Sequence, residues 1–140
     1  MKYQIELDID QDISLVYENY LNGNDMLKWI QGLKDVKELK GSSFEKGSES
    51  LLVFSTHDQI MEMKLTVQDK KPHILDVIYE VPGAWNRCVS TFKKVDGKTH
   101  WVMDVTFVFE QEISLPIERF MDKTKEGMKL YKTYIENMKG

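Results

Sequence analysis

The chain has 140 residues, of which 41% are hydrophobic and 30% are charged, and its formal net charge is −4. This length and composition indicate one folded, soluble domain over residues 1–140 rather than a disordered chain. The acidic balance disfavours nucleic acid as a partner, and no apolar run reaches the ~18 residues that a membrane span needs.

The N-terminal segment has the pattern of a β-strand. Tyr3, Ile5, Leu7 and Ile9 alternate with polar residues, and this period of two predicts a strand with one buried face. The alternation differs from the continuous apolar core of a secretory signal, so we expect a cytoplasmic protein of bacterial type.

Two short helices are predicted to follow. Asp12 is placed to cap a helix that contains Tyr20, and the next sequence, Asn-Gly-Asn, ends it because these residues tolerate positive φ. Asp25 is placed to cap a second helix that contains Trp29. Two brief helices in succession predict a bend in the chain rather than a helical bundle.

The central part of the chain, from Val36 to Phe109, again alternates with a period of two. The dipeptides Pro82-Gly83 and Asp96-Gly97 are typical of tight turns between strands. Strands joined by such short turns predict an antiparallel meander, because parallel pairs need long crossovers.

The strand after Pro82-Gly83 carries polar residues on its predicted inner side. Asn86, Cys88 and Ser90 share their parity with Phe92, so we expect them to face inward. Asn86 and Ser90 either orient the carbonyl of a ligand or satisfy each other and water. Trp85 either closes the mouth of a cavity or packs on a neighbour.

A long amphipathic helix is predicted at the C-terminal end. Apolar residues recur at steps of three and four from Ile117 to Met138, and Ser114 is placed as a cap near Pro116. Gly127 lies inside this helix, where glycine costs about 1 kcal/mol relative to alanine. It is either a tolerated packing defect or a space for close backbone approach or a ligand.

The inward-facing positions are rich in methionine and aromatic residues, which either fill a core or line an adaptable pocket. They include Phe54, Met61, Met63, Tyr79, Trp101, Met103, Met121 and Met128.

Reactive groups form no recognisable set. Cys88 is the single cysteine and has no histidine near it in sequence, so a small buried thiol is expected rather than a nucleophile. His57, His73 and His100 lack the spacing of metal ligands, so neither a metal nor a cofactor is expected.

Several local sequences resemble those of the SRPBCC superfamily, which has the helix-grip or START-like fold, and within it the bacterial polyketide cyclase/dehydrase-like branch. They are "WIQGL" at Trp29, "ELKGSSFEKGSESLLVF" at Glu38, the G-x-W-N of Gly83 to Asn86, "KTHW" before the last strand and "MKLYKTYIE" near the end. The resemblance covers the whole chain. It implies an α+β fold in which a curved antiparallel sheet of about six or seven strands wraps around the long C-terminal helix, with two short helices after the first strand.

The resemblance also implies a cavity between the sheet and the helix that binds a small hydrophobic, lipid-like or polyketide-like molecule. The residues expected to line it are Phe54, Met61, Met63, Tyr79, Trp85, Asn86, Ser90, Trp101, Met103, Met121 and Met128. Two alternatives remain. One is an enzyme of cyclase, dehydratase or hydrolase type that acts on apolar carbonyl compounds, with Tyr79, Asn86 or Ser90 as hydrogen-bonding partners. The other is a protein-interaction module that resembles the activators of heat-shock chaperones.

Overall fold

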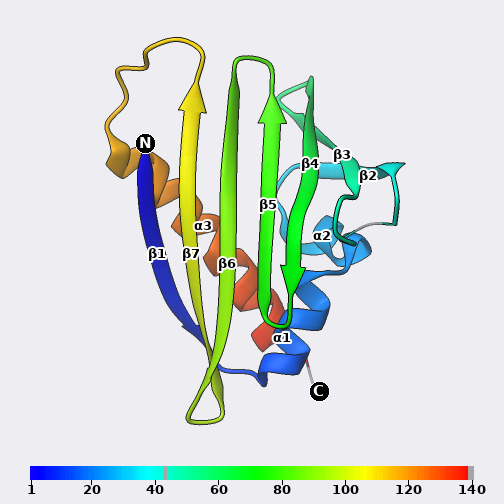
Figure 1. Cartoon of the computed structure of the whole chain (residues 1–140), viewed down its shortest axis with the longest axis vertical. Helices are drawn as coiled ribbons and strands as arrows, with labels where there is room; N and C mark the ends of the chain where they lie inside the picture. Colours follow the sequence, from blue (N-terminus) through cyan, green and yellow to red (C-terminus); the bar gives the residue numbers. More distant parts are fainter. Residues whose placement is uncertain (43, 139–140) are drawn as a thin grey trace.

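The architecture is an antiparallel sheet that bends around one long helix (Figure 1). The computed structural model describes residues 1–42 and 44–138. The elements in chain order are β1 (Lys2–Ile9), α1 (Ile13–Tyr20), α2 (Gly23–Trp29), β2 (Leu33–Lys40), β3 (Glu49–Thr56), β4 (Gln59–Lys71), β5 (Ile74–Val81), β6 (Ala84–Val95), β7 (Lys98–Phe109) and α3 (Ile117–Glu136).

The described strands form one seven-stranded sheet with the order β1-β7-β6-β5-β4-β3-β2. Every neighbouring pair is antiparallel. The N-terminal strand therefore closes one edge beside β7, while β2 forms the other edge. This confirms the predicted meander and the α+β fold class.

Two-residue turns join the strands from β3 to β7. Pro82-Gly83 links β5 to β6 in the tight turn that the sequence predicted, and Gly83 has a positive φ of 87°. Asp96-Gly97 links β6 to β7 with φ values of 51° and 79°, which is the conformation that favours Asp-Gly in hairpins. The turn at His57 and Asp58 also has positive φ at both residues. These tight turns fix the register of the hairpins.

Of the three N-terminal capping residues predicted from the sequence, the structure confirms one. The Asp12 carboxylate accepts a hydrogen bond from the Ser14 amide and caps α1, as predicted. The prediction that Asp25 caps α2 is wrong, because Asn22 accepts from the Asn24 amide and Asp25 lies buried inside the first turn. Ser114 is not the cap of α3 either, since Pro116 holds that position without a side-chain bond.

The core lies between the sheet and the C-terminal half of α3. Tyr131 is fully buried and packs against Trp101 of β7 and Tyr20 of α1, with ring centroids 5.7 and 5.2 Å apart. Its hydroxyl donates to the Val16 carbonyl and so joins α3 to α1. Met128 and Ile135 are buried on the same face of the helix. The N-terminal half of α3 is less buried, and this is where the sheet and the helix leave space.

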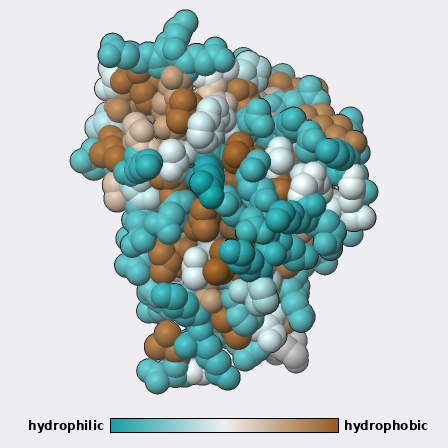
Figure 2. All heavy atoms as spheres, in the orientation of Figure 1, coloured by the Kyte–Doolittle hydropathy of each residue, from teal (hydrophilic) through white to brown (hydrophobic). Residues whose placement is uncertain are grey.

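The opposite face of the sheet is mainly hydrophilic, with hydrophobic side chains scattered over it (Figure 2). There the His100 ring lies between two carboxylates of β1, 2.7 Å from an Asp8 oxygen and 3.0 Å from a Glu6 oxygen. Among the described residues, no helix is long and apolar enough to cross a membrane.

Candidate ligand cavity

An inner chamber of about 310 Å³ lies between the sheet and the N-terminal half of α3. Its wall contains residues of α1, of the end of α2 and the position after it, of five strands and of α3. They are Tyr20, Trp29, Ile30, Leu52, Phe54, Met63, Tyr79, Asn86, Cys88, Trp101, Met103, Phe107, Lys123, Thr124, Gly127 and Met128. Most of these side chains are apolar or aromatic, which is the composition typical of a small-molecule site.

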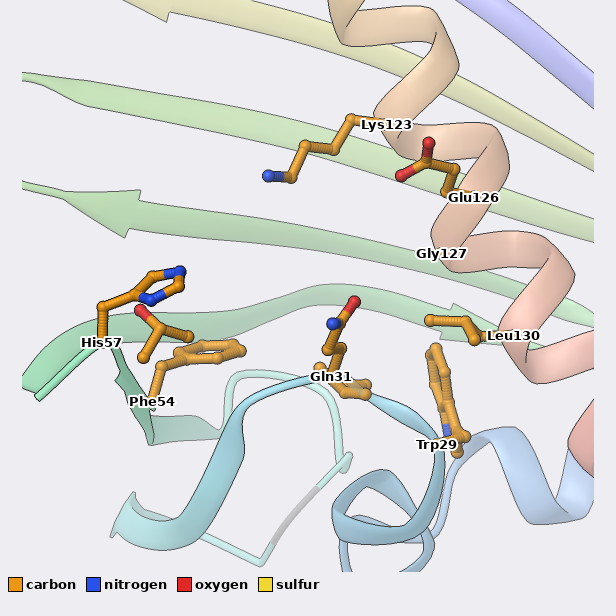
Figure 3. Close-up of a pocket in the computed structure, with 10 residues that line it drawn as sticks. Trp29, Gln31, Phe54, His57, Lys123, Glu126, Gly127 and Leu130 are labelled. Atoms are coloured by element: carbon orange, nitrogen blue, oxygen red, sulfur yellow. The ribbon is translucent and has the colours of Figure 1, made fainter. Parts of the chain in front are cut away.

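A second, outer chamber of about 500 Å³ adjoins the first (Figure 3). It lies between α3 on one side and the end of β3 with the segment after α2 on the other. Its wall shares Trp29, Ile30, Phe54, Lys123 and Gly127 with the inner chamber, and it adds Gln31, Thr56, His57, Glu126 and Leu130. The shared residues form the boundary between a mainly apolar chamber and a more polar one.

Gly127 explains part of the space at this boundary. A Cβ atom built on Gly127 would meet no atom within 4 Å, so the glycine faces open space rather than a closely approaching backbone. The residue lines both chambers. This geometry disagrees with a close backbone approach, and it agrees both with a tolerated packing defect and with room for a ligand.

The Tyr79 hydroxyl is one of several polar groups of residues that line the inner chamber. It makes no hydrogen bond with any described residue. Burial raises the pKa of Tyr79 well above its ordinary value, and the charges that Tyr20 and Cys88 would carry raise it further. The hydroxyl therefore stays protonated and is available as a hydrogen-bond donor.

Cys88 and Asn86 lie together on β6 beside Tyr79. The Asn86 side-chain amide donates to the Cys88 sulfur at 3.3 Å. Burial raises the pKa of the Cys88 thiol to about 12, and the Asn86 bond only partly offsets this effect. The thiol is therefore neutral near pH 7, which argues against a nucleophilic cysteine.

Seven of the candidate residues named from the sequence line the inner chamber. They are Phe54, Met63, Tyr79, Asn86, Trp101, Met103 and Met128. Their strand parity and helix phase, read from the sequence alone, placed them on the correct side.

Four candidates lie elsewhere. Met61 has the same parity as Met63 but is 48% exposed, because the end of β4 extends beyond the cover of α3. Trp85 is 39% exposed on the outer face, paired with Val108, so it does not close the mouth. Ser90 points inward but is only 2% exposed, and its oxygen lies 3.5 Å from the Tyr20 hydroxyl, outside the chamber wall. Met121 packs at the side of the core.

Sequence reasoning missed Tyr20, Trp29 and Lys123 as residues of the wall. Tyr20 and Trp29 are the last residues of α1 and α2. The angle of these short helices to the sheet is set by tertiary packing, which the periodicity of the sequence does not show. Lys123 lies outside the apolar steps of the predicted C-terminal helix, so the helical phase gave no sign that its long side chain reaches the cavity.

The three histidines do not converge. His57 lies at the outer chamber, His73 contacts the Tyr17 ring at the opposite end of β4, and His100 is on the outer face of the sheet. Within the described part of the chain, no group of three histidine, cysteine or acidic residues is placed to hold a metal ion.

Neither a family model nor any curated protein matches the chain. Solved structures do match it. The structure of Ara h 8.0201 is similar with a TM-score of 0.81 at 14% identity, over 96% of this chain and 97% of that one. An uncharacterised protein from Rhizobium leguminosarum gives 0.77 at 14% identity, over 99% and 95% of the two chains. The Zhui aromatase/cyclase from Streptomyces sp. R1128 gives 0.77 at 12% identity, over 97% and 93%.

At these identities the likeness shows the fold alone. The curved seven-stranded sheet, the two short helices after β1 and the long C-terminal helix are those of the helix-grip fold. This confirms the fold that the sequence predicted.

Proposed function

We propose that this protein binds a small hydrophobic molecule in the inner chamber between the sheet and α3. The observation that carries the proposal is the chamber itself. It has a volume of about 310 Å³, within the range of small-molecule sites, and its wall is mainly apolar and aromatic. The resemblance in fold to a structure described as an aromatase/cyclase supports the same class of ligand.

Burial of apolar surface is sufficient to hold such a ligand. A molecule that loses about 400 Å² of apolar surface gains roughly 10 kcal/mol at about 25 cal/mol per Å². Association costs at least about 4 kcal/mol, which leaves about 6 kcal/mol and a Kd of tens of micromolar. Binding in this range needs no catalytic group.

The test is a fluorescence titration with N-phenylnaphthylamine, a neutral apolar probe whose emission rises when it leaves water. Met63→Glu places a carboxylate in the wall of the chamber and should abolish binding, because an unpaired buried charge is costly. Met61→Glu is the matched control, since Met61 lies two residues earlier on the same strand and is exposed. Circular dichroism checks that both variants fold.

Two results would contradict the proposal. One is a folded Met63→Glu variant that binds the probe as tightly as the unchanged protein. The other is an equal loss of binding in the Met61→Glu variant, which would place the probe outside the chamber.

One observation favours a second candidate, an enzyme that acts on apolar carbonyl compounds. The Tyr79 hydroxyl is a neutral donor without a partner inside an apolar chamber, and such a preplaced donor can polarise a carbonyl group. Mass spectrometry of a polyketide-like compound incubated with the protein would detect cyclisation by the loss of water. Tyr79→Phe should then slow turnover while leaving binding of N-phenylnaphthylamine intact, and unchanged turnover in this variant would remove Tyr79 from the reaction.

A further inference from the structure

Among the described residues that line the inner chamber, Lys123 is the single charged one. It also lines the outer chamber, so it lies at the boundary between the two. The Lys123 side chain is therefore within reach of a molecule that occupies either chamber.

The geometry leaves the ammonium group of Lys123 available. Its side chain extends from α3 across the opening toward the side of His57, while the Glu126 carboxylate stays closer to the helix (Figure 3). Neither Lys123 nor Glu126 forms an ion pair with another described residue. Glu126 lines the outer chamber only, so the charge nearest the interior is positive.

We propose that the ligand is an amphiphile with an anionic head group, which pairs with Lys123 at the boundary while its apolar body fills the inner chamber. This inference rests on the function proposed above and assigns the chemical class of the ligand. The orientation follows from the two walls. Apart from Lys123, the inner wall is mainly apolar and its polar groups carry no charge; they include the Tyr79 hydroxyl, the Asn86 amide and the indole N–H groups of Trp29 and Trp101. An ionised group buried there would lose its hydration without gaining an opposite charge.

A cationic head group is disfavoured at the same place. It would have to lie beside the Lys123 ammonium, and Glu126 could attract it only in the outer chamber, away from the apolar interior. A neutral head group could accept a hydrogen bond from Lys123 but would gain no pairing of opposite charges. The pair with a carboxylate lies at a partly open site, so its contribution should be modest and reduced by salt.

The experiment compares decanoate, decanol and decylamine, which share one apolar chain and differ in the charge of the head. Each displaces N-phenylnaphthylamine from the protein at pH 7. We expect decanoate to bind about fivefold more tightly than decanol, or roughly 1 kcal/mol at 1.4 kcal/mol per tenfold, and decylamine to bind most weakly. Added salt should reduce the preference for decanoate.

Two variants locate the charge. Lys123→Met keeps an apolar side chain of similar length and should make decanoate and decanol bind equally. Lys125→Met is the matched control, because Lys125 is exposed on the same helix and lines neither chamber. Glu126→Gln should strengthen the binding of decanoate, since it removes a nearby negative charge.

The outcomes separate the two proposals. Equal affinities for decanoate and decanol in the unchanged protein would overturn the inference and leave the hydrophobic site standing. A preference for decanoate that survives Lys123→Met, or that disappears in Lys125→Met, would also overturn it. If neither the naphthylamine nor any of the decyl compounds binds, the proposed function itself fails and takes this inference with it.

Discussion

Gly127 offers a direct test of the relation between stability and the cavity. Gly127→Ala adds a methyl group to the interior of α3, where alanine is favoured over glycine by about 0.8–1.0 kcal/mol. The new Cβ meets no atom within 4 Å, so no steric cost opposes this gain. We expect the free energy of unfolding to rise by about 1 kcal/mol and Tm by about 3 °C, measured by urea and thermal denaturation.

Gly127→Leu should keep most of this stability but lose binding. The leucine side chain adds four carbon atoms, each close in volume to the roughly 30 Å³ of a water molecule. Together they take up roughly two fifths of the inner chamber of about 310 Å³. We expect the Kd for N-phenylnaphthylamine to rise at least about tenfold, or 1.4 kcal/mol, whereas Gly127→Ala should change it by about twofold or less.

The control is Lys129→Leu, which adds the same side chain to an exposed position of α3 outside both chambers. A stable Gly127→Leu variant with undiminished affinity would refute the reasoning, because the ligand would then not occupy the space beside Gly127. A Gly127→Ala variant less stable than the unchanged protein would show that this space is already filled.

Two further predictions concern stability. Hydrogen bonds first to Asp8 and then to Glu6 raise the pKa of His100, so its stabilising effect is present in full below the unfolded pKa of about 6.5 and is lost as pH rises through the higher folded pKa. His100→Gln should therefore lower the free energy of unfolding at pH 6 by a small amount, less than about 1 kcal/mol because solvent screens this partly exposed cluster, and by still less at pH 9. In a control protein that carries Glu6→Gln and Asp8→Asn, His100→Gln should cost the same at both pH values. An equal cost at both pH values in the protein that keeps Glu6 and Asp8 would contradict the role of the carboxylates. Asp12→Ala removes the cap of α1 and should cost about 1 kcal/mol in urea denaturation, whereas the exposed Asp10→Ala should cost little, and equal effects would show that the cap is dispensable.

The sequence predicted the face of each strand better than the extent of the cavity. Alternation placed Met61 and Met63 on the same side of β4, and the structure keeps that parity. It cannot show where α3 ceases to cover the sheet, since this depends on the crossing angle of two elements far apart in the chain. Met63 therefore lines the chamber while Met61 is exposed.

The short helices were predicted as elements but not in detail. Both Asn22 and Asp25 are good capping residues, and the choice between them depends on the burial of Asp25. The same packing turns Trp29 toward the cavity, where its ring lies 4.9 Å from that of Tyr131. Lys123 was missed for a related reason, because a side chain at the edge of the apolar face of a helix can extend in either direction.

The most direct test of a hydrophobic ligand site is native mass spectrometry of the gently purified protein, followed by organic extraction of whatever accompanies it. We expect a discrete added mass on the unchanged protein that is extracted as an apolar molecule with an acidic group. The added mass should be absent from Met63→Glu and present on Met61→Glu. A protein that carries no added mass and fails to take up N-phenylnaphthylamine at concentrations well above tens of micromolar would contradict the account.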